Sequence, residues 1–174
     1  MICGPTAAGK SGLALALAER YGGVIINADS MQLYADLRVL TARPDVSEEA
    51  RVPHRLYGVL DGAERASVAS WLTMATREIE TARDAGRLPI LTGGTGLYFH
   101  AAMKGLAPVP DVPPDIHAEC IAEYAERGGE AFRRDLLELD PVLGSQLHDG
   151  DSQRLVRAMG CLLYTSPSPR DPTK

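Results

Sequence analysis

Basic residues are not in excess in this chain, which has 18 lysines and arginines, 23 aspartates and glutamates, and a formal net charge of -5 at pH 7. Proteins that coat nucleic acid without sequence preference rely on such cations to neutralise phosphates. The composition therefore argues against that class, although it allows a local basic face.

Long apolar runs are also absent. No stretch approaches the roughly 18 to 20 apolar residues that a membrane-spanning helix needs, and the N-terminus has no basic patch followed by an apolar signal segment. We therefore predict a cytoplasmic protein without a membrane partner.

Cysteine is scarce. Cys3, Cys120 and Cys161 are odd in number, far apart and not grouped with histidines. This pattern suggests neither a disulfide framework nor a zinc site.

A glycine-rich loop of the type Gly-x-x-x-x-Gly-Lys-Ser lies near the start of the sequence. Its residues are Gly4, Pro5, Thr6, Ala7, Ala8, Gly9, Lys10 and Ser11. In such a loop, successive backbone N–H groups surround phosphate oxygens, and the following helix presents its positive end to them. We expect Lys10 to reach the terminal phosphates and the Ser11 hydroxyl to bind Mg²⁺.

Strand, turn and helix patterns alternate through the first hundred residues. Helical spacing of apolar residues predicts a helix over 10–21 and a longer one that begins after Ser67 and ends near Gly86. Short apolar runs predict strands at 24–26 and 88–92. This alternation predicts an α/β fold, a P-loop NTPase-like parallel sheet flanked by helices.

The predicted organisation has three parts. Residues 1–110 form the P-loop core, which we expect to be trimmed at its start, and residues 111–160 form a helical insertion with helices over 116–127 and 130–139. Residues 161–174 contain three prolines and lack apolar periodicity, so we expect a foreign, disordered tail that does not join a core.

Several polar residues are candidates for chemistry, each with a simpler alternative. Asp29, at the carboxyl end of a predicted strand, suits a Mg²⁺-binding or water-positioning carboxylate, a general base, or a helix cap. The glycines from Gly93 to Gly96 suit a plain turn or a site that exposes the Thr95 hydroxyl. Gln153 and Arg157 lie one helical turn apart, which by itself is typical of a solvated helix face.

Six ordered segments resemble the tRNA dimethylallyltransferase family, also called tRNA isopentenylpyrophosphate transferases. They are GPTAAGKS at 4–11, DSMQLY at 29–34, TARP at 41–44, PHRL at 53–56, GGTGLYF at 93–99 and DSQRLVRA at 151–158. The resemblance implies transfer of a dimethylallyl group from dimethylallyl pyrophosphate to the exocyclic amine of the adenosine 3′ of the anticodon in tRNA. It also implies Mg²⁺ as the cofactor and a monomer.

The same resemblance assigns roles to individual residues. It implies catalytic roles for Asp29, Thr6 and Lys10, and makes the loop from Gly4 to Ser11 the pyrophosphate-binding segment. It implies tRNA contacts at Asp29, Ser30, Met31, Gln32, Thr95, His117, Gln153, Arg154, Leu155, Val156 and Arg157. At His117 the family pattern has an arginine, and a histidine carries little charge at neutral pH.

Two other functions remain open at this point. A small-molecule kinase with this loop would use ATP and activate a hydroxyl with Asp29, and a binding module would have no turnover. Because the family continues with a long C-terminal half, the resemblance also predicts that this chain is the N-terminal part of a longer enzyme, with the C-terminal part of the fold missing.

Overall fold

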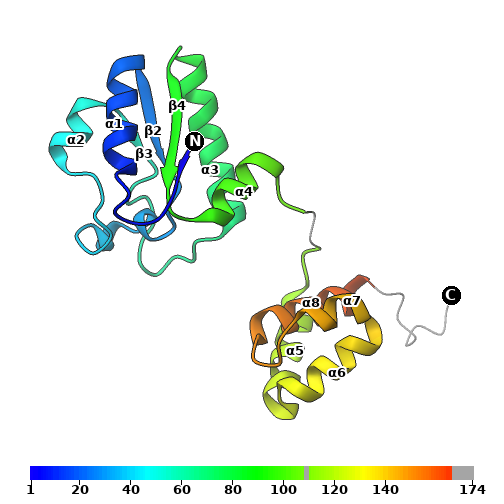
Figure 1. Ribbon diagram of the computed structural model, residues 1–174. Coiled ribbons are helices and arrows are strands. Elements are labelled where there is room, and N and C mark those ends of the chain that lie inside the picture. The colour runs from blue at the N-terminus through cyan, green and yellow to red at the C-terminus, as the bar shows by residue number, and fades with distance from the viewer. Residues whose placement is uncertain (108–109, 166–174) are drawn as a thin grey trace. The chain divides into compact units, whose positions relative to one another are not determined.

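The computed structural model describes residues 1–107 and 110–165. Within it the chain divides into two compact units, Met1–Leu106 and Ala107–Lys174, each of which is described by itself (Figure 1). The division falls a few residues before the boundary expected at 110.

The first unit is a parallel sheet flanked by helices, as the sequence predicts. Its strands lie in the order β1-β4-β2-β3, and every neighbouring pair is parallel. Its elements are β1 (Ile2–Cys3), α1 (Lys10–Tyr21), β2 (Gly23–Asn27), the 3-10 helices η1 (Met31–Leu33) and η2 (Ala35–Leu37), α2 (Val46–Arg51), β3 (His54–Arg55), α3 (Val68–Asp84), β4 (Leu88–Gly93) and α4 (Gly96–Lys104).

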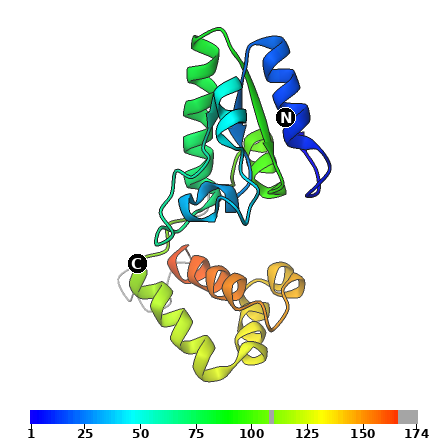
Figure 2. The same cartoon turned by 90° about the vertical axis from the view of Figure 1, so that its left-hand side faces the viewer.

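Both faces of the sheet are covered by helices. Successive side chains of a strand point to opposite faces, so Val24 and Ile26 of β2 pack with α3 and α4, whereas Ile25 packs with Ala14 and Leu15 of α1. Figure 2 shows α1 and α3 on opposite sides of the sheet. Burial on both faces explains why β2 is a continuous apolar run rather than an alternating one.

Trp71 fastens α3 to the end of β2. The helix begins at a capping box in which Ser67 and Ser70 exchange hydrogen bonds. One turn in, the buried Trp71 ring stacks on Tyr98 with 4.3 Å between ring centroids, and its Nε1 donates to the carbonyl of Asn27 over 2.8 Å. These contacts fix the point at which β2 leaves the sheet.

The second unit consists of helices around a core of its own. The core contains Cys120, Phe132, Leu136 and Leu155, all fully buried. The sequence pattern does not predict the short third helix. The helices are α5 (Pro114–Arg127), α6 (Gly129–Leu139), α7 (Pro141–Gln146) and α8 (Ser152–Thr165).

The expectation that the chain leaves the core at Cys161 is wrong for residues 161–165. Helix α8 continues to Thr165, and Leu162 packs against the core of the second unit. Leu155, Met159 and Leu162 recur at helical spacing, so the apolar face of α8 extends past Gly160. The rest of the predicted tail, residues 166–174, lies outside the described residues.

Within the part of the chain that the structure describes, no helix combines the length and apolar character needed to cross a bilayer.

Candidate active site

The carboxyl ends of all four strands meet at one edge of the sheet, because all the strand pairs are parallel. The glycine loop follows β1, Asp29 follows β2, Tyr57 follows β3 and Gly94 follows β4. A cavity of about 380 Å³ opens at this edge. It is lined by Thr6, Ala7, Ala8, Gly9, Lys10, Ser11, Gly12, Asp29, Gln32, Thr41, Ala42, Tyr57, Thr92, Gly93 and Gly94.

The glycine loop turns its backbone toward this cavity. Ala7 and Gly9 adopt left-handed conformations, with φ of 64° and 77°, and α1 begins directly after Gly9. The first N–H groups of a helix have no acceptor within it, so they are available to an anion at the helix N-terminus. The Lys10 ammonium donates to the carbonyl of Pro5 over 2.6 Å, and Ser11 is exposed.

Asp29 is positioned by the buried side chain of Asn27. The Asn27 amide oxygen accepts from the backbone N–H of Asp29, and its nitrogen donates to the carbonyls of Asp29 and Leu56, each over 2.9 Å. The carboxylate itself accepts from the backbone N–H of Met31 over 3.0 Å. One amide therefore ties the segments after β2 and β3 together and holds Asp29 at the cavity.

The glycines at the end of β4 allow a close approach that a plain turn would not require. A Cβ at Gly93 would lie 2.2 Å from the backbone of Ala28, and one at Gly94 would lie 3.1 Å from the Asp29 carboxylate. Thr95 follows them, and its hydroxyl accepts from the backbone N–H of Ser30 over 3.0 Å. The structure thus brings Asp29, Ser30 and Thr95 together.

Two segments line the cavity although the sequence patterns do not predict them as parts of a site. Thr41 and Ala42 belong to a segment that carries the family resemblance, and Gln32 donates to the carbonyl of Thr41 over 2.8 Å. Tyr57 lies just after another such segment, which was the available signal. Burial raises the pKa of the Tyr57 hydroxyl well above its ordinary value, and the charge of Asp29 adds to the rise.

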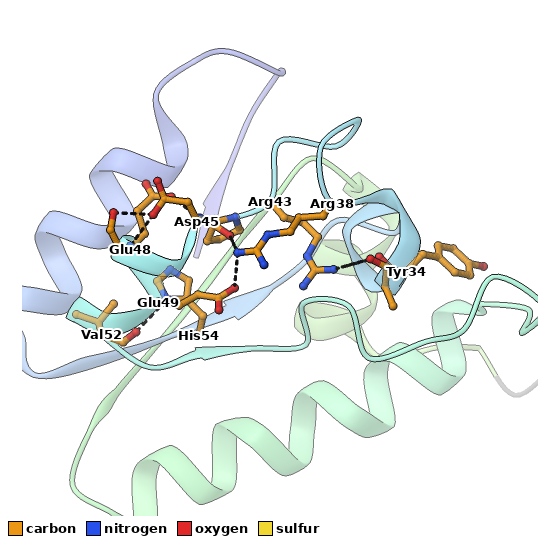
Figure 3. A network of polar contacts seen from close by, with 11 residues as sticks. Tyr34, Arg38, Arg43, Asp45, Glu48, Glu49, Val52 and His54 are labelled. Atoms are coloured by element: carbon orange, nitrogen blue, oxygen red, sulfur yellow. Dashed lines mark hydrogen bonds and ion pairs between the residues drawn. The ribbon is translucent and has the colours of Figure 1, made fainter.

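A polar network supports the chain on both sides of Thr41 and Ala42 (Figure 3). Arg43 donates through Nη1 to the carbonyls of Tyr34 and Ala35, both over 3.3 Å, and Arg38 donates to the carbonyl of Pro44 over 3.1 Å. Among the described residues, the buried Nε of Arg43 has no hydrogen-bond partner. The arginines therefore brace a segment that has little regular secondary structure.

The remaining predicted tRNA contacts lie in the second unit. His117 is exposed on α5, and Gln153, Arg154 and Arg157 are exposed on α8, where they line an apolar hollow with Leu147 and its neighbours. Leu155 and Val156 are buried in the core, with exposed fractions of 0% and 5%. Their side chains face the core, because the helix turn that exposes Gln153 and Arg157 turns these two inward, and a tRNA contact at these two positions stays a prediction.

The model of the IPP transferase family matches residues 32–172. The chain belongs to the IPP transferase family. The match includes residues 161–172, most of the segment whose composition predicts a foreign tail. It also confirms the family resemblance that the six ordered segments carry.

Similar proteins of the family cover nearly all of this chain. The tRNA dimethylallyltransferase of Rhodospirillum rubrum is 53% identical over 171 residues, which are 98% of this chain and 52% of the relative. That of Methylocella silvestris is 51% identical over 168 residues, 97% of this chain and 55% of the relative. The chain thus spans about half the length of these IPP transferase relatives.

Solved structures of the family share the fold. The full-length tRNA isopentenylpyrophosphate transferase of Bacillus halodurans is 35% identical with a TM-score of 0.61, over 97% of this chain and 55% of that one. A eukaryotic dimethylallyltransferase acting on tRNA is 25% identical with a TM-score of 0.81, over 92% of this chain and 40% of that one.

Proposed function

We propose that this site binds dimethylallyl pyrophosphate and transfers its dimethylallyl group to the exocyclic amine of the adenosine 3′ of the anticodon in tRNA. The observation that carries the proposal is the carboxylate of Asp29 in the same cavity as the glycine loop, in a chain of the IPP transferase family. A phosphate-binding loop holds the leaving group, and the carboxylate accepts a proton from the nucleophile.

The chemistry follows from what each group can do. In the transfer, a C–N bond forms between the amine and the allylic carbon, the C–O bond to pyrophosphate breaks, and Asp29 takes the amine proton. The loop N–H groups, the Thr6 hydroxyl and Lys10 stabilise the charge that develops on the departing pyrophosphate. Lys10 exchanges its hydrogen bond to Pro5 for a phosphate oxygen.

The donor set also fits magnesium held mainly by the substrate. Within residues 1–107 and 110–165, no group of three or more histidine, cysteine, aspartate or glutamate side chains could hold a metal ion. Mg²⁺ commonly keeps waters and binds through substrate phosphates rather than an all-protein cage. We therefore assign it to the pyrophosphate oxygens, with the Ser11 hydroxyl as the protein ligand.

The proposed acceptor is tRNA, and the proposal includes a cytoplasmic monomer. The side chains that suit contact with RNA are the half-buried Ser30, Gln32 and Thr95 and the exposed Met31 near the site, and the exposed His117, Gln153, Arg154 and Arg157 on the helical unit. Chemistry on a base requires the base to leave its stack, so the adenosine enters the cavity singly.

Label transfer tests the proposal. The chain, and a chimera that continues after Met159 with the C-terminal half of the Rhodospirillum rubrum relative, are incubated with labelled dimethylallyl pyrophosphate, Mg²⁺ and tRNA. We expect label on the tRNA. The rate of label transfer should fall by about 10²- to 10⁴-fold in the Asp29→Asn variant. The asparagine side chain keeps an acceptor for the backbone N–H of Met31, so the local structure should persist. Pyrophosphate binding by this variant is therefore the control and should be unchanged. Unlabelled tRNA with both proteins would refute the proposal.

A further inference from the structure

We infer that Tyr57 is a substrate-binding residue whose hydroxyl donates a hydrogen bond to a pyrophosphate oxygen of the prenyl donor. The inference rests on the proposed function and deepens it, because it names a contact outside the glycine loop. The tyrosine lies outside the sequence motifs, directly after the segment at 53–56.

Tyr57 reaches the site through the edge strand of the sheet. β3 pairs with β2 in parallel, with Ile25 opposite His54 and Ile26 opposite Arg55. Two residues beyond the strand, Tyr57 lines the same cavity as the loop residues and Asp29. Its position therefore corresponds, one strand further along, to the position of Asp29 after β2.

Tyr57 lies between two residues with left-handed backbone, and the first of them is strained. Leu56 is a buried non-glycine residue with φ of 62°, and Gly58 has φ of 61°. The other described non-glycine residues with positive φ, Ala7 and Ala42, both line the cavity. A left-handed conformation costs an L-residue free energy, and such residues gather at functional sites.

Hydrogen bonds hold the strained segment in place. The carbonyl of Leu56 accepts from the Asn27 amide, and the N–H of Gly58 donates to the carbonyl of Gln32, each over 2.9 Å. Asn27 also holds Asp29. The same buried amide thus orients the carboxylate and the tyrosine, which indicates that the two are placed relative to one another.

The ring and the hydroxyl of Tyr57 have different surroundings. The ring packs against the apolar cluster of α1 and meets His54 edge-on, with 5.6 Å between ring centroids. No hydrogen bond joins the hydroxyl to another residue in the described part of the chain. Packing of the ring limits its freedom, so a hydrogen bond from the hydroxyl loses little entropy when it forms.

The chemistry of the cavity favours a donor role. Asp29 only accepts hydrogen bonds when ionised, and pyrophosphate oxygens only accept. Burial and the charge of Asp29 raise the pKa of the Tyr57 hydroxyl, so the hydroxyl keeps its proton at neutral pH. A protonated hydroxyl that has no protein partner in this cavity is suited to donate a hydrogen bond to a phosphate oxygen.

Calorimetric titration of the full chain with inorganic pyrophosphate and Mg²⁺ tests this contact. Tyr57→Phe keeps the ring and removes only the hydroxyl, and hydrogen bonds to charged groups are among the stronger ones. We expect the Kd to rise by about tenfold or more, with the circular dichroism spectrum and Tm retained. The control is Tyr21→Phe at the exposed end of α1, which should leave the Kd unchanged.

The alternative is that the ring only forms an apolar wall for the dimethylallyl chain. In that case Tyr57→Phe binds pyrophosphate as the wild type does, whereas Tyr57→Leu loses affinity for dimethylallyl pyrophosphate alone. That outcome overturns the inference and leaves the proposed function intact. A wild-type chain that does not bind pyrophosphate overturns both. If Tyr57→Phe binds pyrophosphate more weakly than the wild type, but neither the wild-type chain nor the chimera labels tRNA, only the proposed function is overturned.

Discussion

Gly93 and Gly94 control the distance between the end of β4 and the segment that carries Asp29. The first glycine contacts backbone, because a Cβ there would lie 2.2 Å from Ala28. The second faces a side chain, because a Cβ would lie 3.1 Å from the Asp29 carboxylate. Adjacent residues thus have separate roles, one in the fold and one at the site.

Alanine substitutions should separate these roles. Gly93→Ala forces two strands apart, so we expect the free energy of unfolding to fall by about 1–3 kcal/mol. Gly94→Ala displaces only the carboxylate, so we expect little change in stability and a decrease of roughly ten- to hundredfold in prenyl transfer. Denaturant unfolding and the label-transfer assay measure the two effects, and equal losses of stability would contradict the assignment.

The sequence predicts the residues of the site that follow recognisable strands. The glycine loop and Asp29 lie where expected, because the loop is recognised by its own motif and apolar runs mark β2 and β4. Tyr57 could not be placed in this way, since β3 consists of only His54 and Arg55 and has no apolar pattern. Resemblance alone does not separate Leu155 and Val156 from Gln153 and Arg157, because one matching segment contains core residues as well as surface ones.

At the scale of elements, α8 differs most from expectation. The sequence pattern predicts that family-like structure ends near Gly160, because the residues that follow contain three prolines and lack apolar periodicity. Where a helix ends depends on whether its next apolar residues can pack against a core. Leu162 packs against the core of the second unit, so α8 continues past Gly160. Composition over a window of residues does not contain that information.

Two neighbouring leucines test this extension of α8. Leu162 packs against the core, whereas Leu163 is 48% exposed. We expect Leu162→Ala to lower the free energy of unfolding of the helical unit by about 1–2 kcal/mol, because it removes partly buried methyl groups. Leu163→Ala should change it by less than about 0.5 kcal/mol. Thermal and urea unfolding followed by circular dichroism distinguish the variants, and equal effects would argue against the packed helix.

At the scale of the whole molecule, the candidate site belongs to one unit. Every residue that lines the cavity lies between Thr6 and Gly94, within the first unit. The helical unit has a separate core. Binding of pyrophosphate and stability of the helical unit should therefore be separable properties.

A pair of core variants tests this separation. Phe132→Ala removes a fully buried ring from the helical unit, at a cost of about 3–5 kcal/mol to that unit. We expect the calorimetric Kd for Mg²⁺-pyrophosphate to stay at the wild-type value. Trp71→Ala, the matched change in the first unit, should weaken binding because it releases the end of β2. A parallel loss of affinity in Phe132→Ala would show that the units are coupled.

The parallel pairing of β1 with β4 has a consequence for the order of folding. β1 contributes only Ile2 and Cys3, which pair with Thr92 and Gly93. Nearly the whole first unit therefore separates the glycine loop from the strand that frames it, and closing such a long chain segment is entropically costly. Although the loop leaves the ribosome first, its partner emerges much later. The cavity at this edge of the sheet is thus among the last features of the unit to form as it folds.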